Sequence, residues 1–389
     1  MIKNILKKIK FEDVKAGTKY MVALVICKLF GKYLPSDIWL ISERGDEARD
    51  NAYHLYKYIR ENHADIKCFY LIKHRSVDYQ KIKKYNLIIE YGSLKHFIYY
   101  IKSKVCISTH IYRYIPDYRV TQRLDGFFKM NKVRVFLQHG IIQGCHPYLS
   151  AKSNQLDLFC CGARKECEYI KESLGYKSDV AICTGLARYD ELYDFKVKNQ
   201  ILLMPTWRGD LYLLSDDEFI KTDYYKAFQS IINSDMLFNK MQEIGYELVF
   251  YPHYEMQKFI HLFQSKFNNI IIAEHEKYDV QKLLKESSIL ITDYSSVFFD
   301  FAYMKKPIIY YQFDKEIYHQ RHYEKGYFDY EYDGFGEVVV GYDIIAKLIE
   351  YMDKPDMLDI YKERVDSFFG VHDQNNCKRI FEIIERKVK

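Results

Sequence analysis

Short apolar runs alternate with helical segments along most of this chain, and this alternation constrains the fold more than any other feature of the sequence. The runs recur at intervals of roughly 15 to 30 residues, and each is long enough for one strand. Such spacing is typical of βαβ units in a parallel sheet. Because the runs form two series, we predict an α/β protein of two doubly wound halves, with a linker near residues 190–200.

The predicted strands of the first series are 38–42, 67–72, 87–90, 105–108, 133–138, 156–161 and 180–184. Those of the second are 201–205, 248–251, 270–273, 289–292, 308–311 and 338–340. The intervening or following helices are predicted at 48–62, 164–174, 224–232, 280–286, 296–303, 344–352 and 357–387. Ligands of such sheets bind at the carboxyl ends of the strands, so we expect functional side chains there.

Basic residues concentrate at the N-terminus. The net charge is +5, from 58 Lys and Arg against 53 Asp and Glu, and residues 1–33 hold eight Lys against Glu12 and Asp13. A protein that binds nucleic acid would spread this charge over a binding face, so we expect no nucleic-acid partner. Residues 1–33 are predicted to form basic amphipathic helices on an anionic membrane surface, with Ile2, Ile5, Leu6 and Ile9 on the apolar side. A solvated helix packed on its domain is the alternative.

The nine cysteines include no CxxC pair and lack the spacing of a zinc site. Most lie in apolar runs, where buried free thiols are expected, and this favours a reducing compartment. No N-terminal apolar run is long enough to span a bilayer, and no signal-peptide cleavage site follows one. We therefore predict a cytoplasmic protein, peripheral at the inner face of the cell membrane.

Two polar motifs follow strands of the first half. His139 and Gly140 follow the strand 133–138, and an imidazole there is suited to general-base chemistry, while the glycine permits close approach of a ligand. A core histidine bonded to a backbone carbonyl is the alternative. Arg188 and Asp190 follow the predicted strand 180–184. Arg188 could bind phosphate while Asp190 holds it, or the two could form a structural ion pair.

The second half repeats this pattern with Arg208 and His253. Arg208 follows the first strand of that half, and its planar guanidinium suits a bidentate phosphate contact, although it could also stack on Trp207. His253 again stands at a strand end. It mirrors His139, so we expect the two histidines to face one another across a cleft.

The strand 289–292 ends in a run of hydroxyl and carboxylate side chains before the helix 296–303. Thr292, Asp293, Ser295 and Ser296 are therefore predicted to bind phosphate, because a helix N-terminus offers free N–H groups and a positive dipole end. The alternative is that Ser and Asp serve only as N-caps.

Several common motifs are missing from the sequence. It contains no GxGxxG after the first strand, no GxxxxGK[ST], no HExxH and no GxSxG. A dehydrogenase, a P-loop NTPase, a zinc protease and an α/β-hydrolase are therefore disfavoured.

The ordered motifs resemble those of the CDP-glycerol glycerophosphotransferases, which prime and polymerise teichoic acids and related capsular polymers. The resemblance covers most of residues 38–385. Its blocks are Gln-His-Gly at 138–140, Gly-Leu-Ala-Arg-Tyr-Asp at 185–190, Pro-Thr-Trp-Arg at 205–208, Tyr-Pro-His at 251–253, the long block 279–314, Gly-Tyr-Phe-Asp at 326–329 and Asp-Gln-Asn at 373–375.

The resemblance implies a GT-B-like fold of two facing Rossmann-type domains with a cleft between them. It implies the domains 34–195 for the acceptor and 196–389 for the CDP-linked donor, beside the membrane segment 1–33. By motif match, His139 corresponds to the general base, and His253, Arg208, Ser295 and Ser296 to pyrophosphate contacts. His139 and His253 are therefore the two residues assigned as catalytic. Arg188, Asp190, Gly140 and Arg321 are assigned to the cleft.

The implied reaction transfers glycerol phosphate, or a related alditol phosphate such as ribitol phosphate, from its CDP-linked form to a hydroxyl of a lipid-linked acceptor. CMP is released. No metal site or resident cofactor is expected, although Mg²⁺ could enter with the pyrophosphate.

The chain departs from the family pattern at Tyr251, where relatives often have Arg or Lys, and at 333–336, where relatives have Pro-Gly-Pro. Both positions leave the choice of alditol open. A GT-B glycosyltransferase using a nucleotide sugar, a nucleotide-sugar 2-epimerase and a non-catalytic scaffold remain alternatives.

Overall fold

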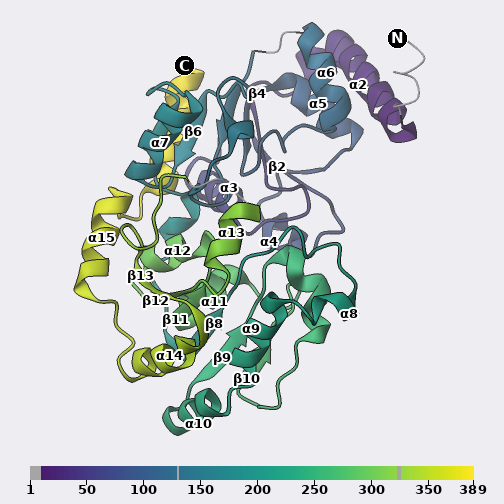
Figure 1. Cartoon of the computed structure of the whole chain (residues 1–389). Coiled ribbons are helices and arrows are strands. Elements are labelled where there is room, and N and C mark those ends of the chain that lie inside the picture. Colours follow the sequence, from purple (N-terminus) through teal and green to yellow (C-terminus); the bar gives the residue numbers. More distant parts are fainter. Residues whose placement is uncertain (1–9, 129–130, 322–325) are drawn as a thin grey trace. The chain divides into compact units, whose positions relative to one another are not determined.

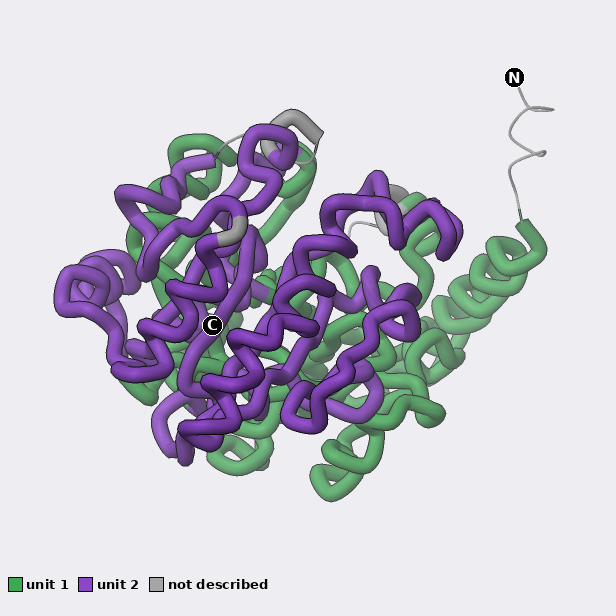
Figure 2. Tube along the Cα trace, turned by 60° about the horizontal axis from the view of Figure 1, so that its bottom comes forward, with its two compact units in different colours: residues 1–139, 148–190, 373–389 green, residues 140–147, 191–372 purple. Residues whose placement is uncertain are grey.

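The computed structural model describes residues 10–128, 131–321 and 326–389, and the chain divides into two compact units (Figure 2). Unit 1 comprises residues 1–139, 148–190 and 373–389, and unit 2 comprises residues 140–147 and 191–372. Two short 3-10 helices, η2 (Pro147–Leu149) and η3 (Ala187–Glu191), lie where the chain passes from one unit to the other.

Unit 1 is built on a parallel sheet with the strand order β3-β2-β1-β4-β5-β6-β7. Figure 1 labels its strands β2, β4 and β6. Its inner strands are apolar and buried along their length, as expected for a sheet covered by helices on both faces. The strands are β1 (Ile38–Ser42), β2 (Cys68–Ile72), β3 (Ile88–Glu90), β4 (Ser103–Ser108), β5 (Val133–Phe136), β6 (Leu158–Cys161) and β7 (Ala181–Cys183).

The helices of unit 1 begin and end at recognisable signals. Asp50 and Ser93 cap two of them, and Gly175, with φ of 75°, ends another. They are α2 (Phe11–Phe30), η1 (Gly31–Tyr33), α3 (Asn51–Asn62), α4 (Tyr79–Lys83), α5 (Leu94–Lys102), α6 (Tyr118–Phe128), α7 (Arg164–Leu174) and α16 (Asn376–Val388).

Unit 2 has a second parallel sheet with the order β10-β9-β8-β11-β12-β13. Its strands are β8 (Lys198–Leu203), β9 (Glu247–Phe250), β10 (Ile270–Ile272), β11 (Ser287–Thr292), β12 (Ile308–Tyr311) and β13 (Gly336–Val339). Its helices are α8 (Asp216–Phe219), α9 (Asp223–Ile232), α10 (Asp235–Ile244), η4 (Tyr254–Leu262), α11 (Val280–Glu286), α12 (Val297–Tyr303), α13 (Lys315–Arg321), η5 (Gly341–Asp343), α14 (Ile344–Asp353) and α15 (Asp359–Phe369).

Both sheets follow one topology. Counted within its unit, the sheet of unit 2 runs 3-2-1-4-5-6, the order of a doubly wound Rossmann-type sheet, and the sheet of unit 1 runs in the same order with β7 added as a seventh strand. The order reverses between β1 and β4 and between β8 and β11. The predicted fold class, two α/β halves of Rossmann type, is therefore confirmed, and each predicted strand overlaps an observed one.

The C-terminal tail differs from the prediction in two ways. The segment predicted as one helix is divided into α15 and α16 by Gly370, which adopts a left-handed backbone with φ of 70°. The predicted domain 196–389 also ends too late, because α16 belongs to unit 1. There Phe381 packs in the core against Trp39, with ring centroids 5.7 Å apart.

The N-terminal helix α2 is packed on one side and exposed on the other. Ala16, Tyr20 and Ala23 are buried with Phe97 of α5. The predicted apolar positions Ile2, Ile5, Leu6 and Ile9 lie outside the described residues. Within the described part of the chain, no helix is both long enough and apolar enough to cross a bilayer.

Candidate functional site

His139 is carried beyond the sheet edge by the turn that follows β5. The Leu137 N–H still bonds to the Ser108 carbonyl at 2.9 Å, but Gln138 has φ of 62°, in the left-handed region that non-glycine residues rarely occupy. The Gln138 side chain supports this turn by donating to the Cys160 carbonyl at 2.7 Å. The next residue, His139, is exposed, so its imidazole stands at a strand end as predicted.

Two side chains hold the backbone on either side of this histidine. Asn51 Nδ2 donates to the Gln138 carbonyl at 2.9 Å, and Arg188 Nη1 donates to the His139 carbonyl at 3.0 Å. The two supports are linked, because the Arg188 N–H donates to Asn51 Oδ1 at 3.0 Å. Arg188 is buried and forms an ion pair with Asp50 at 2.8 Å.

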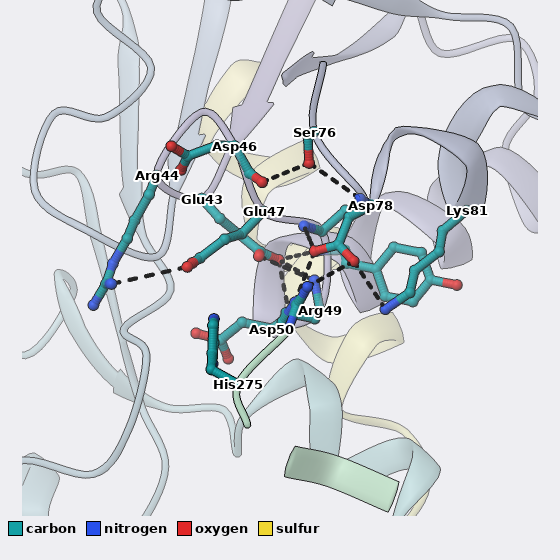
Figure 3. A network of polar contacts seen from close by, with 12 residues as sticks. Glu43, Arg44, Asp46, Glu47, Arg49, Asp50, Ser76, Asp78, Lys81 and His275 are labelled. Atoms are coloured by element: carbon teal, nitrogen blue, oxygen red, sulfur yellow. Dashed lines mark hydrogen bonds and ion pairs between the residues drawn. The ribbon is translucent and has the colours of Figure 1, made fainter. Parts of the chain in front are cut away.

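The N-terminus of α3 anchors these supports through a network of acids (Figure 3). Glu43 accepts hydrogen bonds from the backbone N–H groups of Arg49, Asp50 and Tyr53, while Asp78 pairs with the Arg49 guanidinium at 2.7 Å. Burial, with a smaller contribution from Asp50, raises the pKa of Glu43 to about 8. Asp50 is thus fixed both by its position as the α3 N-cap and by Arg188.

Asp190 does not hold Arg188, which corrects the pairing considered from the sequence. Its carboxylate accepts from the backbone and side-chain N–H groups of Asn376 and from the Cys377 N–H, each at 2.8 Å. Asp190 therefore stabilises the start of α16, where a carboxylate satisfies free backbone donors and complements the helix dipole.

Arg208 lies after β8 in unit 2, and its guanidinium is buried between two carboxylates. Asp293 lies 2.8 Å from Nη2, and Asp314 accepts from Nε at 2.8 Å and Nη2 at 3.1 Å. Nη1 donates to the carbonyls of Thr206 and Trp207. All five N–H donors of the guanidinium therefore have partners within the protein, and the predicted direct phosphate contact would require Arg208 to exchange one of them.

Aromatic rings surround this buried ion group. The guanidinium carbon of Arg208 lies 4.7 Å from the Tyr318 ring centroid and 5.3 Å from that of Tyr294, and these two rings stack 3.5 Å apart. Two adjacent carboxylates raise the pKa of Arg208 even though burial acts in the opposite direction. Arg208 is thus a permanent cation at the centre of a rigid frame.

Thr292 and Asp293 are the other buried parts of that frame. Thr292 Oγ1 donates to the Met204 carbonyl at 2.7 Å, and Asp293 Oδ1 accepts from the N–H groups of Thr206 and Tyr294. Burial raises the pKa of Asp293, and Arg208 together with these N–H groups opposes that shift. Both residues bind β8 to β11 at the edge where the predicted phosphate site lies.

Ser295 and Ser296 lead into α12, as predicted. The helix spans Val297–Tyr303, within one residue of the predicted 296–303, and is short. Ser296 makes no side-chain cap, and it packs against Gly140 so closely that a Cβ there would lie 2.9 Å from Ser296 Oγ. Gly140 thus allows a close approach, but within the protein rather than to a ligand.

The segment 140–147, which follows His139 directly, is bound to the same loop of unit 2. Gln143 Nε2 donates to the Tyr294 carbonyl at 2.6 Å, and its Oε1 accepts from the Tyr330 hydroxyl at 2.9 Å. Gly326 lies against the Gln143 backbone, where a Cβ would be 2.1 Å from the carbonyl oxygen. This segment of unit 2 is therefore anchored beside Ser295 and Ser296.

His253 follows β9 and begins η4. Its Nδ1 accepts from the Glu255 N–H at 3.3 Å, which places the proton of the neutral ring on Nε2. The ring also stacks on Trp207 at a centroid distance of 6.2 Å. A histidine in this tautomer can donate to an oxygen anion, which agrees with the predicted role in donor binding.

Two further points of the sequence analysis concern Arg321 and metal binding. Arg321 is the last residue of α13, and its side chain lies outside the described part of the structure. Among the residues that are described, no group of three or more His, Cys, Asp or Glu side chains is placed to hold a metal ion.

The structure adds residues that the sequence did not single out, chiefly Asp50, Asn51, Gln143 and Asp314. Each lies within a few residues of a strand end or a helix start, the position that pointed to His139 and Arg208. The sequence did not show which residues they contact, because these contacts join segments far apart in the chain.

Comparison with known proteins identifies a family model and several relatives. The model for CDP-Glycerol:Poly(glycerophosphate) glycerophosphotransferase matches residues 23–386. The minor teichoic acid biosynthesis protein GgaB of Bacillus subtilis is 35% identical over 381 residues, which cover 94% of this chain and 41% of GgaB. A teichoic acid poly(glycerol phosphate) polymerase of Staphylococcus epidermidis is 29% identical over 49% of this chain and 25% of its own length. The chain thus spans less than half of either relative.

Solved structures share the fold. The wall teichoic acid polymerase TagF matches with a TM-score of 0.67 and 16% identity over 98% of both chains, and one TagF structure was obtained with CDPG. A UDP-N-acetylglucosamine 2-epimerase from Listeria monocytogenes matches with a TM-score of 0.55 and 12% identity over 91% of this chain and 97% of its own. At these identities, the matches establish the fold alone.

Proposed function

Because this chain belongs to the CDP-glycerol:poly(glycerophosphate) glycerophosphotransferase family, we propose that it transfers glycerol phosphate, or a related alditol phosphate such as ribitol phosphate, from a CDP-linked donor to a lipid-linked saccharide or polymer. CMP is the second product, and the pathway is teichoic acid or capsule biosynthesis. The observation that carries this proposal is the match over residues 23–386, which spans both sheets and includes the histidine and serine motifs at their strand ends.

His139 is the proposed general base. The acceptor hydroxyl loses its proton to the imidazole as its oxygen attacks the phosphorus that carries the alditol. The bond from that phosphorus to the CMP oxygen then breaks, so atoms and charge balance without a covalent enzyme intermediate. Asn51 and Arg188 support this step by fixing the main chain around His139.

Unit 2 is proposed to bind the CDP-linked donor. His253 Nε2–H and the hydroxyl groups of Ser295 and Ser296 are donors suited to pyrophosphate oxygens. Arg208 acts with Asp293 as a positioning residue, since its donors already bond to the protein. The proposal includes Mg²⁺ only as an ion that enters the site together with the pyrophosphate of the donor.

The decisive experiment is CMP release by the purified chain given CDP-glycerol, CDP-ribitol or a UDP-sugar, each with and without a lipid-linked acceptor. We expect CMP only from a CDP-alditol with acceptor, and a gain of alditol phosphate units in product mass. His139→Ala should lower kcat by roughly 10²- to 10⁴-fold while donor binding persists, as for loss of a positioned base. Ser295→Ala with Ser296→Ala should instead raise the donor KM.

His261→Ala is the matched control, because His261 is an exposed histidine of unit 2 that pairs with Asp216. Its turnover should equal that of the unaltered chain. Transfer from a UDP-sugar, with neither CDP-alditol consumed, would replace the proposal by a glycosyltransferase. Conversion of a UDP-sugar without acceptor would indicate an epimerase, and His139→Ala turnover at the unaltered rate would exclude the base.

Membrane association is the second part of the proposal, and the exposed side of α2 supports it. Phe11, Val14, Val25 and Leu29 are all more than half exposed and recur at helical spacing on the side opposite Tyr20. Exposed lysines, Lys15 and Lys28 among them, lie along the same helix. An apolar stripe beside cations suits an anionic bilayer surface, where a lipid-linked acceptor resides.

Vesicle sedimentation tests this part separately. The chain should sediment with vesicles of phosphatidylglycerol and phosphatidylcholine, less so at high salt, and Val25→Glu with Leu29→Glu should abolish sedimentation. Ile360→Glu, at an exposed apolar residue of α15, is the control and should sediment normally. Equal sedimentation of all three proteins would assign α2 to packing alone.

A further inference from the structure

A second histidine, His110, lies flat against the ring of His139. The ring centroids are 4.6 Å apart and the planes differ by 9°. The two residues follow β4 and β5, which pair in parallel with Ser108 opposite Phe136, so neighbouring strand ends bring them together. His110 has no role predicted from the sequence, and the proposed transfer step does not involve it.

The His110 ring is held at both nitrogens. Arg44 Nε lies 3.2 Å from His110 Nε2, and a guanidinium can only donate, so Nε2 is the acceptor. The ring proton therefore lies on Nδ1, which donates to Thr109 Oγ1 at 3.0 Å. Thr109 is itself fully buried, so this partner is fixed by the fold. One tautomer and one ring plane follow from these two contacts.

His110 stays neutral at the pH of the cell. Burial lowers its pKa to about 2, and electrostatic interactions with His139, Arg44 and Arg113 act in the same direction. The Arg44 guanidinium is in turn 3.8 Å from the carboxylate of Glu47. Because the His110 ring does not bind a proton at cellular pH, it cannot serve as the general base. It can stack on the ring of His139 without adding a charge.

We propose that His110 is a positioning residue that sets the ring orientation of His139. The inference rests on the proposed role of His139 as general base. Asn51 and Arg188 hold the main chain around His139, and two side-chain torsions set the direction of its imidazole. Proton transfer requires one ring nitrogen to face the acceptor hydroxyl. A fixed parallel ring at 4.6 Å restricts those torsions.

The first test compares His110→Ala, which removes the ring, with His110→Phe, which keeps a flat ring without its two hydrogen bonds. His110→Ala should lower kcat roughly 10- to 100-fold at unchanged donor KM, the loss expected when a reacting group is misplaced. His110→Phe should recover part of that loss. Recovery by a ring that cannot bond to Arg44 or Thr109 separates stacking from a role in local folding.

The second test observes His139 directly by NMR of histidine-labelled protein, with its resonance assigned from the spectrum of His139→Ala. His110→Ala should shift the ring-proton resonance of His139 and the pH midpoint of its titration, since a stacked ring contributes both a ring current and a local environment. Thr109→Val, which keeps the ring but removes its Nδ1 partner, should give a smaller shift. His74→Ala, at a half-exposed histidine paired with Glu90, is the control.

The two readouts separate the possible failures. An unchanged His139 resonance in His110→Ala, or unchanged kcat with a shifted resonance, overturns the positioning role. If His139→Ala retains full turnover, the general-base proposal fails, while the resonance still reports whether the rings stack. If His110→Ala does not fold, the kcat and resonance of His110→Phe and Thr109→Val decide the inference by the same criteria.

Discussion

The two units are a pair of sheets with one topology and different residues at their strand ends. In unit 1 the ends of β4 and β5 carry His110 and the exposed His139, and the acids lie behind them at the start of α3. In unit 2 the ends of β8, β11 and β12 converge on the buried Arg208. One fold thus presents a titratable group in one unit and a permanently charged frame in the other.

The two units also share a buried lysine at the amino ends of their strands. Lys132, just before β5, donates to the carbonyls of Tyr100 and Ser103 at the end of α5. Lys306, just before β12, donates to the carbonyls of Leu284 and Ser287 at the end of α11. Both are buried, and each satisfies a helix C-terminus that would otherwise keep unbonded carbonyls. The amino ends of these strands therefore share a structural feature, whereas the residues at the carboxyl ends differ.

The two tryptophans allow the units to be followed separately, because Trp39 lies in unit 1 and Trp207 in unit 2. The largest expected effect is for Arg208→Met, which leaves two buried carboxylates without their cation and should destabilise unit 2 by about 3–5 kcal/mol. Arg188→Met in unit 1 removes the ion pair with Asp50 and the hydrogen bond to the His139 carbonyl, and about 1–3 kcal/mol is expected. Urea unfolding in Trp39→Phe and Trp207→Phe backgrounds measures each unit. Equal losses would mean that the two arginines have equivalent roles.

The lysine pair should behave alike. Lys132→Met and Lys306→Met each leave buried carbonyls unsatisfied, so we expect each to destabilise its own unit by about 1–3 kcal/mol. Turnover per folded molecule should not change, because neither lysine lies at a carboxyl strand end. The same two single-tryptophan backgrounds serve as the measurement. A loss confined to one unit would show that the structural equivalence is not an energetic one.

The last prediction concerns the pH dependence of unit 1. The pKa of Glu43 is raised from 4.5 to about 8, so between these values the folded chain holds a proton that the unfolded chain has lost. The stability of unit 1 should therefore fall as pH rises from about 4.5 to about 8 and level off above. Glu43→Gln cannot ionise, and its stability relative to the unaltered chain should rise over that interval. Parallel pH profiles of the two proteins would contradict this.

Local pattern was sufficient to predict most of the fold. Strands β1 and β12 have the predicted bounds because they are apolar runs buried on both faces, and such burial requires no knowledge of the partner strand. The C-terminal tail was assigned to the wrong unit for the opposite reason. The apolar face of α16 is evident from its sequence, but nothing local tells which sheet it covers.

The candidate site, like the fold, has one part that the sequence predicts and another that it does not. The sequence by itself determined that His139, His253, Ser295 and Ser296 stand at strand ends, since a strand end follows from an apolar run and the polar residue after it. Only the tertiary structure decided which partners the charged groups take. Arg208 meets Asp314 across 106 residues and Arg188 meets Asp50 across 138, contacts that depend on strand order and register rather than on spacing along the chain.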